Sequence, residues 1–544
     1  MNKLKIITMI KNYLMHFNIS KYINKMTIHI PKISNQYGCI EKPVYLICYM
    51  SLVIIILIYS TIPVYEVEGN NIDDKTFLYS TAGIIHYDNF INLISNIDKI
   101  RSHCSGDNYC EWRVTERLGA YNNYILYSSI VNIVNYFLTS KTLNETEKIS
   151  ISYSFSFLIQ HLLIYLIGFF LILFGTRPTN ILMLLFLVAV VVTDKWMMNA
   201  KLIYLFKLIP DSLLAFGYTP AIYVSRGVAG LAFMTACAAY IGDRKKILTL
   251  IILMLPLIHL GYSFFLCAIL FLALLLSFFL EKEKQYKLLL ITGGVLGISV
   301  VLNFITILPM IGKGSEIIKL PELAHSMLVN MNYTNLFLLV AFFAVSLVSS
   351  FFFYKNYHIT WPLRITVITF LLQVTLQLLG SYHSSLTGLY GDALANQSIS
   401  QLYPRLSGAM SIPAQVLTFV QFLLVVFWFF VMVNRSKMNA VFKVLIYLAI
   451  PYVCYQVTDM KSFYARSLRN VTYLTSGFRE RLKMVNSRIE RVPYDLEMGL
   501  KKDQYSSYSF EEIKTIGIDK VDPKNEVALS LSVYYFLNNS GAEK

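Results

Sequence analysis

Charged side chains are scarce in this chain. Only 15% of its 544 residues are Asp, Glu, Lys or Arg, whereas 56% are hydrophobic, and the mean hydropathy is +0.54. A water-soluble protein of this size needs a largely polar surface, and this composition does not supply one. The scarcity of charge therefore excludes an ordinary soluble enzyme and indicates a protein whose surface lies in a lipid bilayer.

Several motifs of soluble enzymes are also missing. The chain has no P-loop, no glycine-rich dinucleotide fingerprint, no HExxH and no GxSxG. A nucleotide-sugar donor therefore has no recognisable site. The 47 basic and 32 acidic residues give a net charge of +15, but basic patches interleaved with aromatic residues are absent, so we expect no nucleic-acid partner.

Cysteine is used sparingly. The seven cysteines form no CxxC pair, and most of them lie in apolar runs, where they are expected to pack as small apolar residues. Cys104 and Cys110 differ, because they flank the polar stretch Ser-Gly-Asp-Asn-Tyr. A short disulfide between them is predicted if this loop faces an oxidising compartment.

In contrast to charged residues and cysteine, long apolar runs are abundant in this chain. Runs of about 20 apolar residues predict transmembrane helices. The fold class is therefore all-α, a polytopic membrane protein with about eleven transmembrane helices and a helical first periplasmic loop. The predicted spans are 44–64, 155–175, 179–194, 222–242, 246–263, 264–280, 287–309, 334–354, 360–380, 413–433 and 440–457.

Basic residues set the predicted orientation. Lys and Arg crowd the connections at 243–246, 281–284, 354–355 and 435–437, and also the tail 1–43. The positive-inside rule makes this side cytoplasmic. The predicted organisation is then a basic cytoplasmic tail (1–43), a transmembrane domain (44–457) with periplasmic loop 65–154, and a periplasmic C-terminal tail or small cap (458–544). All the long connections lie on the outer side.

The first outer loop carries helical signals. Apolar residues recur at helical spacing from Ile72 to Ile100, and Asp73 is a good N-cap residue. The segment from Tyr121 to Phe137 is aromatic-rich and amphipathic. It predicts either a helix lying in the headgroup layer or a helix of a small packed ectodomain.

An acidic cluster lies at the start of this loop, formed by Glu66, Glu68, Asp73 and Asp74. A carboxylate at the membrane boundary can take a proton from an acceptor hydroxyl, or it can hold a divalent metal ion on a phosphosugar. The alternative is an ordinary solvated face. The cluster marks the mouth of the membrane domain as a candidate active site.

The pattern Asp73-Asp74-x-x-Phe77-x-Tyr79-x-x-Ala82 resembles the local motif of the GT-C superfamily of membrane glycosyltransferases. The resemblance covers about residues 40–310 and implies catalysis by Asp73 or Asp74 as base. It also implies a polyprenyl-phosphate-linked sugar donor, a glycan or lipid-linked acceptor, and a place in the bacterial inner membrane. The chain looks more like a lipopolysaccharide-modifying O-antigen enzyme than like the protein O-mannosyltransferases, whose WWD segment it lacks.

Four further residues are candidate substrate ligands. Arg226 and Arg405 open predicted spans from outside, where a guanidinium is suited to bind a lipid-linked phosphate. Tyr403 precedes Arg405, and His259 lies at the outer end of the fifth span. The structural alternatives are interface anchoring for the arginines and a hydrogen-bonded packing role for the histidine.

Two other functions remain open. A Wzy-type O-antigen polymerase or ligase shares many spans and arginine-bearing outer loops. A glycolipid transporter or flippase is the third hypothesis, although such proteins commonly show internal repeats and ionisable residues at mid-span.

Overall fold

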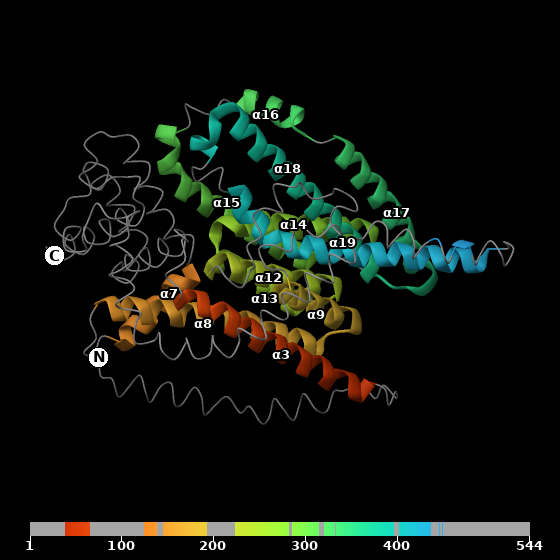
Figure 1. The fold of residues 1–544 in the computed structure, drawn as a ribbon, viewed down its shortest axis with the longest axis horizontal. Helices are drawn as coiled ribbons and strands as arrows, with labels where there is room; N and C mark the ends of the chain where they lie inside the picture. The colour runs from red at the N-terminus through yellow and green to blue at the C-terminus, as the bar shows by residue number, and fades with distance from the viewer. Residues whose placement is uncertain are drawn as a thin grey trace.

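The computed structural model describes residues 38–65, 125–138, 145–192, 224–281, 285–314, 320–331, 333–395 and 402–436, together with 445–446 and 449. Every regular element in these ranges is an α-helix, which confirms the predicted fold class for this part of the chain (Figure 1).

Five helices are long and apolar enough to cross a membrane. They are α14 (Leu260–Leu280), α15 (Tyr286–Gly314), α17 (Tyr333–Tyr357), α18 (Trp361–Ala395) and α19 (Leu402–Arg435). Shorter apolar stretches lie in α3 (Gly38–Tyr65), α8 (Glu145–Phe174), α9 (Arg177–Val192) and α12 (Val224–Ile241). The chain thus has the character of a membrane protein, while the number of eleven spans stays a prediction.

The short connections gather at one end of the bundle, called here the turn end. Thr179, which follows the α8–α9 connection, packs against Gly242 in the turn between α12 and α13 (Lys245–Ile258). Gln285, before α15, donates a hydrogen bond to Asp243. Arg364, in the first turn of α18, pairs with Asp243 and with Glu281 at the end of α14. Four short connections therefore lie together, and three of them, at 243–246, 281–284 and 354–355, are among those predicted to be cytoplasmic.

The opposite end, called here the loop end, is where the long connections begin. Lys42 of α3 donates to the carbonyl of Leu173 at the end of α8, so these two helices run antiparallel and Tyr65 lies at the loop end. α9 ends and α12 begins at this end as well. In Figure 1 the turn end lies on the right, where α3 begins and α19 ends.

The core is built around α12. Its residues from Gly227 to Ile241 are all buried, and five of them are alanines. Small side chains let neighbouring helix backbones approach closely in membrane bundles. α12 accordingly contacts α8, α9, α13, α18 and α19, and it forms the centre of the bundle.

The helix break after the fifth predicted span differs from the sequence-based prediction. The break was expected after Ser263, but it lies at His259, whose backbone is extended (φ −156°, ψ 100°). The histidine side chain accepts a hydrogen bond from the Tyr262 amide and so caps α14. The predicted spans 246–263 and 264–280 are therefore α13 and α14, and α13 is only 14 residues long.

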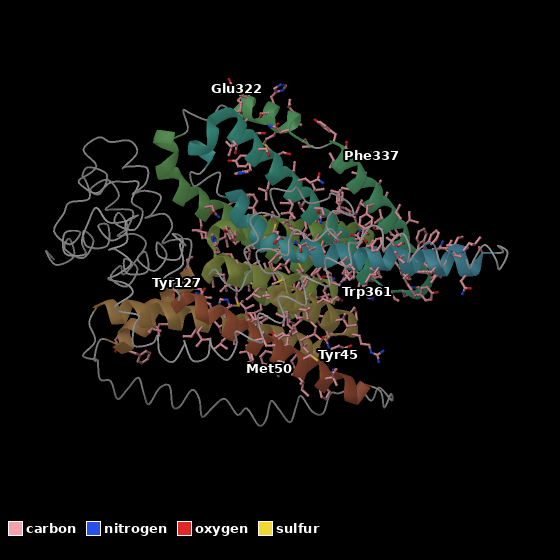
Figure 2. The ribbon with its side chains drawn as sticks, in the orientation of Figure 1. Tyr45, Met50, Tyr127, Glu322, Phe337 and Trp361 are labelled. Carbon is pink, nitrogen blue, oxygen red and sulfur yellow. The ribbon has the colours of Figure 1, made fainter. Side chains whose placement is uncertain are left out.

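Two helices extend well beyond their apolar runs. α18 continues to Ala395, past the predicted limit of 380, and α19 begins at Leu402 instead of 413. Much of the predicted outer segment 381–412 is thus helical. Between α15 and α17 a short helix, α16 (Leu320–Val329), packs against α18. Figure 2 shows Glu322 of α16 far from Trp361, which lies at the turn end.

Helix α7 (Ile125–Leu138) confirms the helix predicted within 121–137. It packs on α8 with Tyr127 and Ile130 buried, while Ile133, Tyr136 and Phe137 are exposed. An exposed apolar face of this kind suits contact with lipid. The headgroup location itself stays a prediction.

Candidate functional site

The predicted catalytic carboxylates lie outside the described residues. These carboxylates are Asp73 and Asp74. The other members of the acidic cluster, Glu66 and Glu68, and the predicted disulfide partners Cys104 and Cys110 also lie outside the described residues. The structure places only their point of entry, because α3 ends at Tyr65, at the loop end.

Three of the other predicted ligands lie in helix first turns. Arg226 is the third residue of α12, and Tyr403 and Arg405 lie in the first turn of α19. Both helices begin toward the loop end, the end at which α3 finishes (Figure 1). The side chains of these three residues are outside the described part of the chain, so their predicted contacts with phosphate stay predictions.

His259 has a defined structural role. Its side chain is 6% exposed, its ring stacks on Tyr262 with 3.6 Å between centroids, and its Nδ1 accepts the Tyr262 amide N–H at 3.2 Å. α15 holds the same turn, since the Asn303 amide donates to the Leu260 carbonyl at 3.0 Å. The imidazole therefore helps to build the α13–α14 turn, and its predicted role in substrate binding stays a prediction.

A buried ion cluster ties the helices together at the turn end. Arg364 donates through Nε to Glu281 Oε1 at 2.7 Å and through Nη2 to Glu281 Oε2 at 2.6 Å. Its Nη1 donates to the Tyr240 carbonyl at 3.0 Å and lies 3.0 Å from Asp243 Oδ1. The side chains of Arg364 and Glu281 are 4% and 3% exposed. A bidentate pair of this kind is both strong and directional.

The cluster satisfies its own charges. The guanidinium is paired with two carboxylates and one carbonyl, so the strongest charge-assisted contacts are already made within the protein. Such a group is expected to hold the α12–α13, α14–α15 and α17–α18 connections in register, because separating either buried charge from its partner is costly. The cluster is therefore a structural anchor. The sequence analysis did not predict it, because Arg364 lies within the predicted apolar span 360–380.

A polar stripe runs along α18. Its members recur every fourth residue and are all buried: Thr369, Gln373, Gln377, Ser381 and Ser385. Residues four apart lie on nearly the same face of a helix, and each step drifts slightly around the axis. Near mid-helix the stripe meets α19, where Gln373 Nε2 donates to Thr418 Oγ1 at 2.9 Å. Farther along it meets the end of α16, where Asn330 donates to Ser385 at 3.0 Å.

A narrow crevice opens on this stripe between α17, α18 and α19. Aromatic and apolar residues form one part of its lining, namely Leu339, Phe342, Phe343 and Phe370. The remainder is polar and consists of Thr369, Gln373, Thr418 and Gln421. Every one of these residues belongs to a helix stretch long and apolar enough to span a membrane.

Three polar atoms of the crevice have no hydrogen-bond partner within the described structure: Thr369 Oγ1, Gln373 Oε1 and Gln421 Oε1. The three side chains are 2%, 1% and 2% exposed. Leaving a buried polar group unpaired costs about 1–3 kcal/mol. Other buried atoms of α17 and α19 also lack a partner, namely Ser346 Oγ, Gln415 Nε2 and Trp428 Nε1.

The described residues contain no group of three or more His, Cys, Asp or Glu side chains placed to hold a metal ion. The predicted metal option rests on the first-loop carboxylates, which lie outside those residues. Comparison with protein-family models, with curated proteins and with solved structures finds no match to this chain.

Proposed function

We propose that the protein is a GT-C-like membrane glycosyltransferase that moves a sugar from a polyprenyl-phosphate-linked donor to a glycan or lipid-linked acceptor. The observation that carries the proposal is that short connections lie at one end of the bundle and long connections begin at the other. The short turns gather at one end, while α3 finishes and α12 and α19 begin toward the other. Tyr65, the last described residue before the acidic cluster, and the helix starts bearing Arg226 and Arg405 therefore share the loop end.

This sharing suits a reaction at the membrane boundary. A lipid-linked donor keeps its tail in the bilayer and presents its phosphate at the surface, where arginines bind it bidentately. The acceptor hydroxyl oxygen forms a bond to the sugar's anomeric carbon, the bond from that carbon to the phosphate oxygen breaks, and polyprenyl phosphate leaves. The hydroxyl proton passes to Asp73 or Asp74, which acts as general base.

The proposal is tested with purified protein in proteoliposomes. We expect label to pass from a radiolabelled polyprenyl-phosphate sugar to acceptor lipids extracted from the source membrane. A product carrying a single added sugar supports a transferase, and a ladder of repeat units favours the polymerase alternative. Retention of all label on the donor across a panel of sugars contradicts both.

One observation favours a transporter as second candidate. The buried stripe on α18 carries polar groups through the membrane-spanning region, and such a path can pass a polar headgroup. The stripe contains no charged residue, unlike most ion-coupled transport paths. Movement of a fluorescent glycolipid between leaflets, without chemical change, would support this candidate over the transferase.

A further inference from the structure

The starts of α13 and α15 lie side by side at the turn end. Gln285, the residue before α15, donates through Nε2 to Asp243 Oδ1, two residues before α13, at 2.9 Å. The two helices also pack against each other. Each of the two joined positions is followed within three residues by basic side chains, namely Arg244 and Lys246 on one chain segment and Lys287 on the other. The contact thus brings three cations to one part of the molecule.

The charges of these three cations are not neutralised within the protein. Arg244, Lys246 and Lys287 have no ion-pair partner among the residues that the structure describes. Asp243, the carboxylate that joins the two turns, already pairs with the buried Arg364 at 3.0 Å. Lys246 and Lys287 are exposed, and Arg244 is half-buried. This part of the turn end therefore carries a net positive charge that an anion would complement.

An exposed apolar row continues from each lysine along its helix. On α13, exposed residues follow Lys246 at steps of four, three and four: Leu250, Leu253 and Leu257. On α15, exposed residues follow Lys287 at steps of three, four, four and three: Leu290, Gly294, Ile298 and Val301. Steps of three and four residues keep side chains on one face of a helix. Each lysine therefore heads an apolar row on the surface of the bundle.

The row on α15 is open and has the length of a lipid chain. At 1.5 Å per residue it extends about 21 Å, whereas one leaflet of the hydrocarbon core is about 15 Å thick. Nothing lies within 4 Å of a Cβ added at Gly294 or Gly297, so no neighbouring side chain covers the middle of the row. Tyr286, beside Lys287, is exposed, and tyrosines are enriched at the level of the lipid headgroups. A lipid can therefore lie here without displacing any side chain.

We propose that this surface binds an anionic phospholipid from the leaflet at the turn end. The phosphate lies at the starts of α13 and α15, where Lys246, Lys287 and Arg244 attract it, and the acyl chains lie along the apolar rows. A neutral lipid makes the same apolar contacts without neutralising the cations, and a free phosphate makes no apolar contact. The surface is at the opposite end of the bundle from the proposed sugar transfer, and the proposal is independent of that chemistry.

The test is native mass spectrometry of the purified full chain, released from nanodiscs that contain equal amounts of phosphatidylglycerol and phosphatidylcholine with the same acyl chains. The two lipids differ in mass, so the spectrum reports which one stays bound to the protein. We expect phosphatidylglycerol to be the first bound lipid about 25-fold more often, because an attraction of about 1 kcal/mol for each of two lysines corresponds to that ratio. A ratio below about fivefold overturns the proposal.

Variants localise the surface. Lys246→Gln and Lys287→Gln should each lower the ratio about fivefold, and the double variant should remove most of the preference. Lys42→Gln is the matched control, since it removes the same charge from an exposed residue at the same end, on a helix that packs against α8 and α9. All these variants should fold like the parent, because each side chain is exposed. An unchanged ratio in the double variant contradicts the proposal. So does an equal fall in the Lys42 variant, because the attraction would then depend on the total charge of the turn end and not on this surface.

Discussion

Arg364 illustrates how a single side chain can organise a membrane bundle. It is the fourth residue of α18, and its partners lie in two other connections. Glu281, one of these partners, is 83 residues away in sequence. The pair is nearly inaccessible, so its energy depends on complete pairing and not on solvent. At this scale the turn end is held by hydrogen bonds that reach between helices.

Replacing Arg364 with Met should lower the free energy of unfolding strongly, by about 3–5 kcal/mol, because Glu281 would be left buried without a partner. The double variant Arg364→Met with Glu281→Leu should recover most of this loss, since two apolar residues replace the pair. Thermal unfolding in detergent, followed by size-exclusion chromatography, measures both. Lys245→Met is the control. Lys245 is exposed, and its Nζ lies 3.9 Å from Asp243 Oδ2, so this ion pair is weak. Equal stability of Arg364→Met and the control would show that the pair is not an anchor.

Two glycines provide a second test at the residue scale. A Cβ added at Gly242 would clash with Thr179, whereas nothing lies within 4 Å of a Cβ added at Gly294. Gly242→Ala should therefore destabilise the protein by about 1–3 kcal/mol through overpacking. Gly294→Ala should be neutral, or stabilising by up to about 1 kcal/mol through helix propensity. Thermal unfolding of the two variants compares them, and the reverse order would contradict the close contact of the two turns.

At the scale of elements, the apolar runs predicted most helices but not their ends. Runs of apolar residues located α12, α14, α15 and α17 within a few residues. α18 and α19 were underestimated because their continuations carry polar residues, and a helix can continue through polar residues when neighbouring helices bury them. The four-residue spacing of the stripe on α18 was visible in the sequence. Its burial depended on α16 and α19, and no local pattern shows that.

The candidate site was predicted less completely than the fold. Carboxylates, arginines and a histidine were chosen for their chemistry, and of these only the His259 side chain is described. The ion cluster and the polar crevice escaped prediction because each depends on residues brought together from distant helices. Glu281 was counted as part of a charged loop, and Gln373 as part of an ordinary span.

Substitutions in the α13–α14 turn test whether His259 caps α14 or binds substrate. His259→Asn keeps a side-chain acceptor for the start of α14, whereas His259→Leu removes it. We expect the Leu variant to lose about 1 kcal/mol or more of stability and the Asn variant to lose less. Both measurements are thermal unfolding in detergent. If the Asn variant is stable but loses sugar transfer, the imidazole binds substrate; if it retains transfer, the histidine is structural.

At the scale of the whole molecule, the bundle has two dissimilar ends, and their sidedness is the main expectation. The positive-inside rule assigns the turn end to the cytoplasm. In a cysteine-free background, Lys355→Cys should react with a membrane-impermeant maleimide only after permeabilisation of the cells. Tyr333→Cys, at the opposite end of α17, should react in intact cells. Both side chains are exposed in the structure. The opposite labelling pattern would reverse the orientation and place the long loops in the cytoplasm.

The central claim is that a carboxylate at the start of the first long loop catalyses sugar transfer. The most direct measurement is transfer of labelled sugar in membranes carrying Asp73→Asn, Asp74→Asn, Glu66→Gln or Glu68→Gln at matched protein abundance. A positioned general base contributes about 10²–10⁴-fold to the rate, so we predict a loss of that size in Asp73→Asn or Asp74→Asn. The Gln variants should retain most of the activity. Full transfer by both Asn variants would contradict the claim.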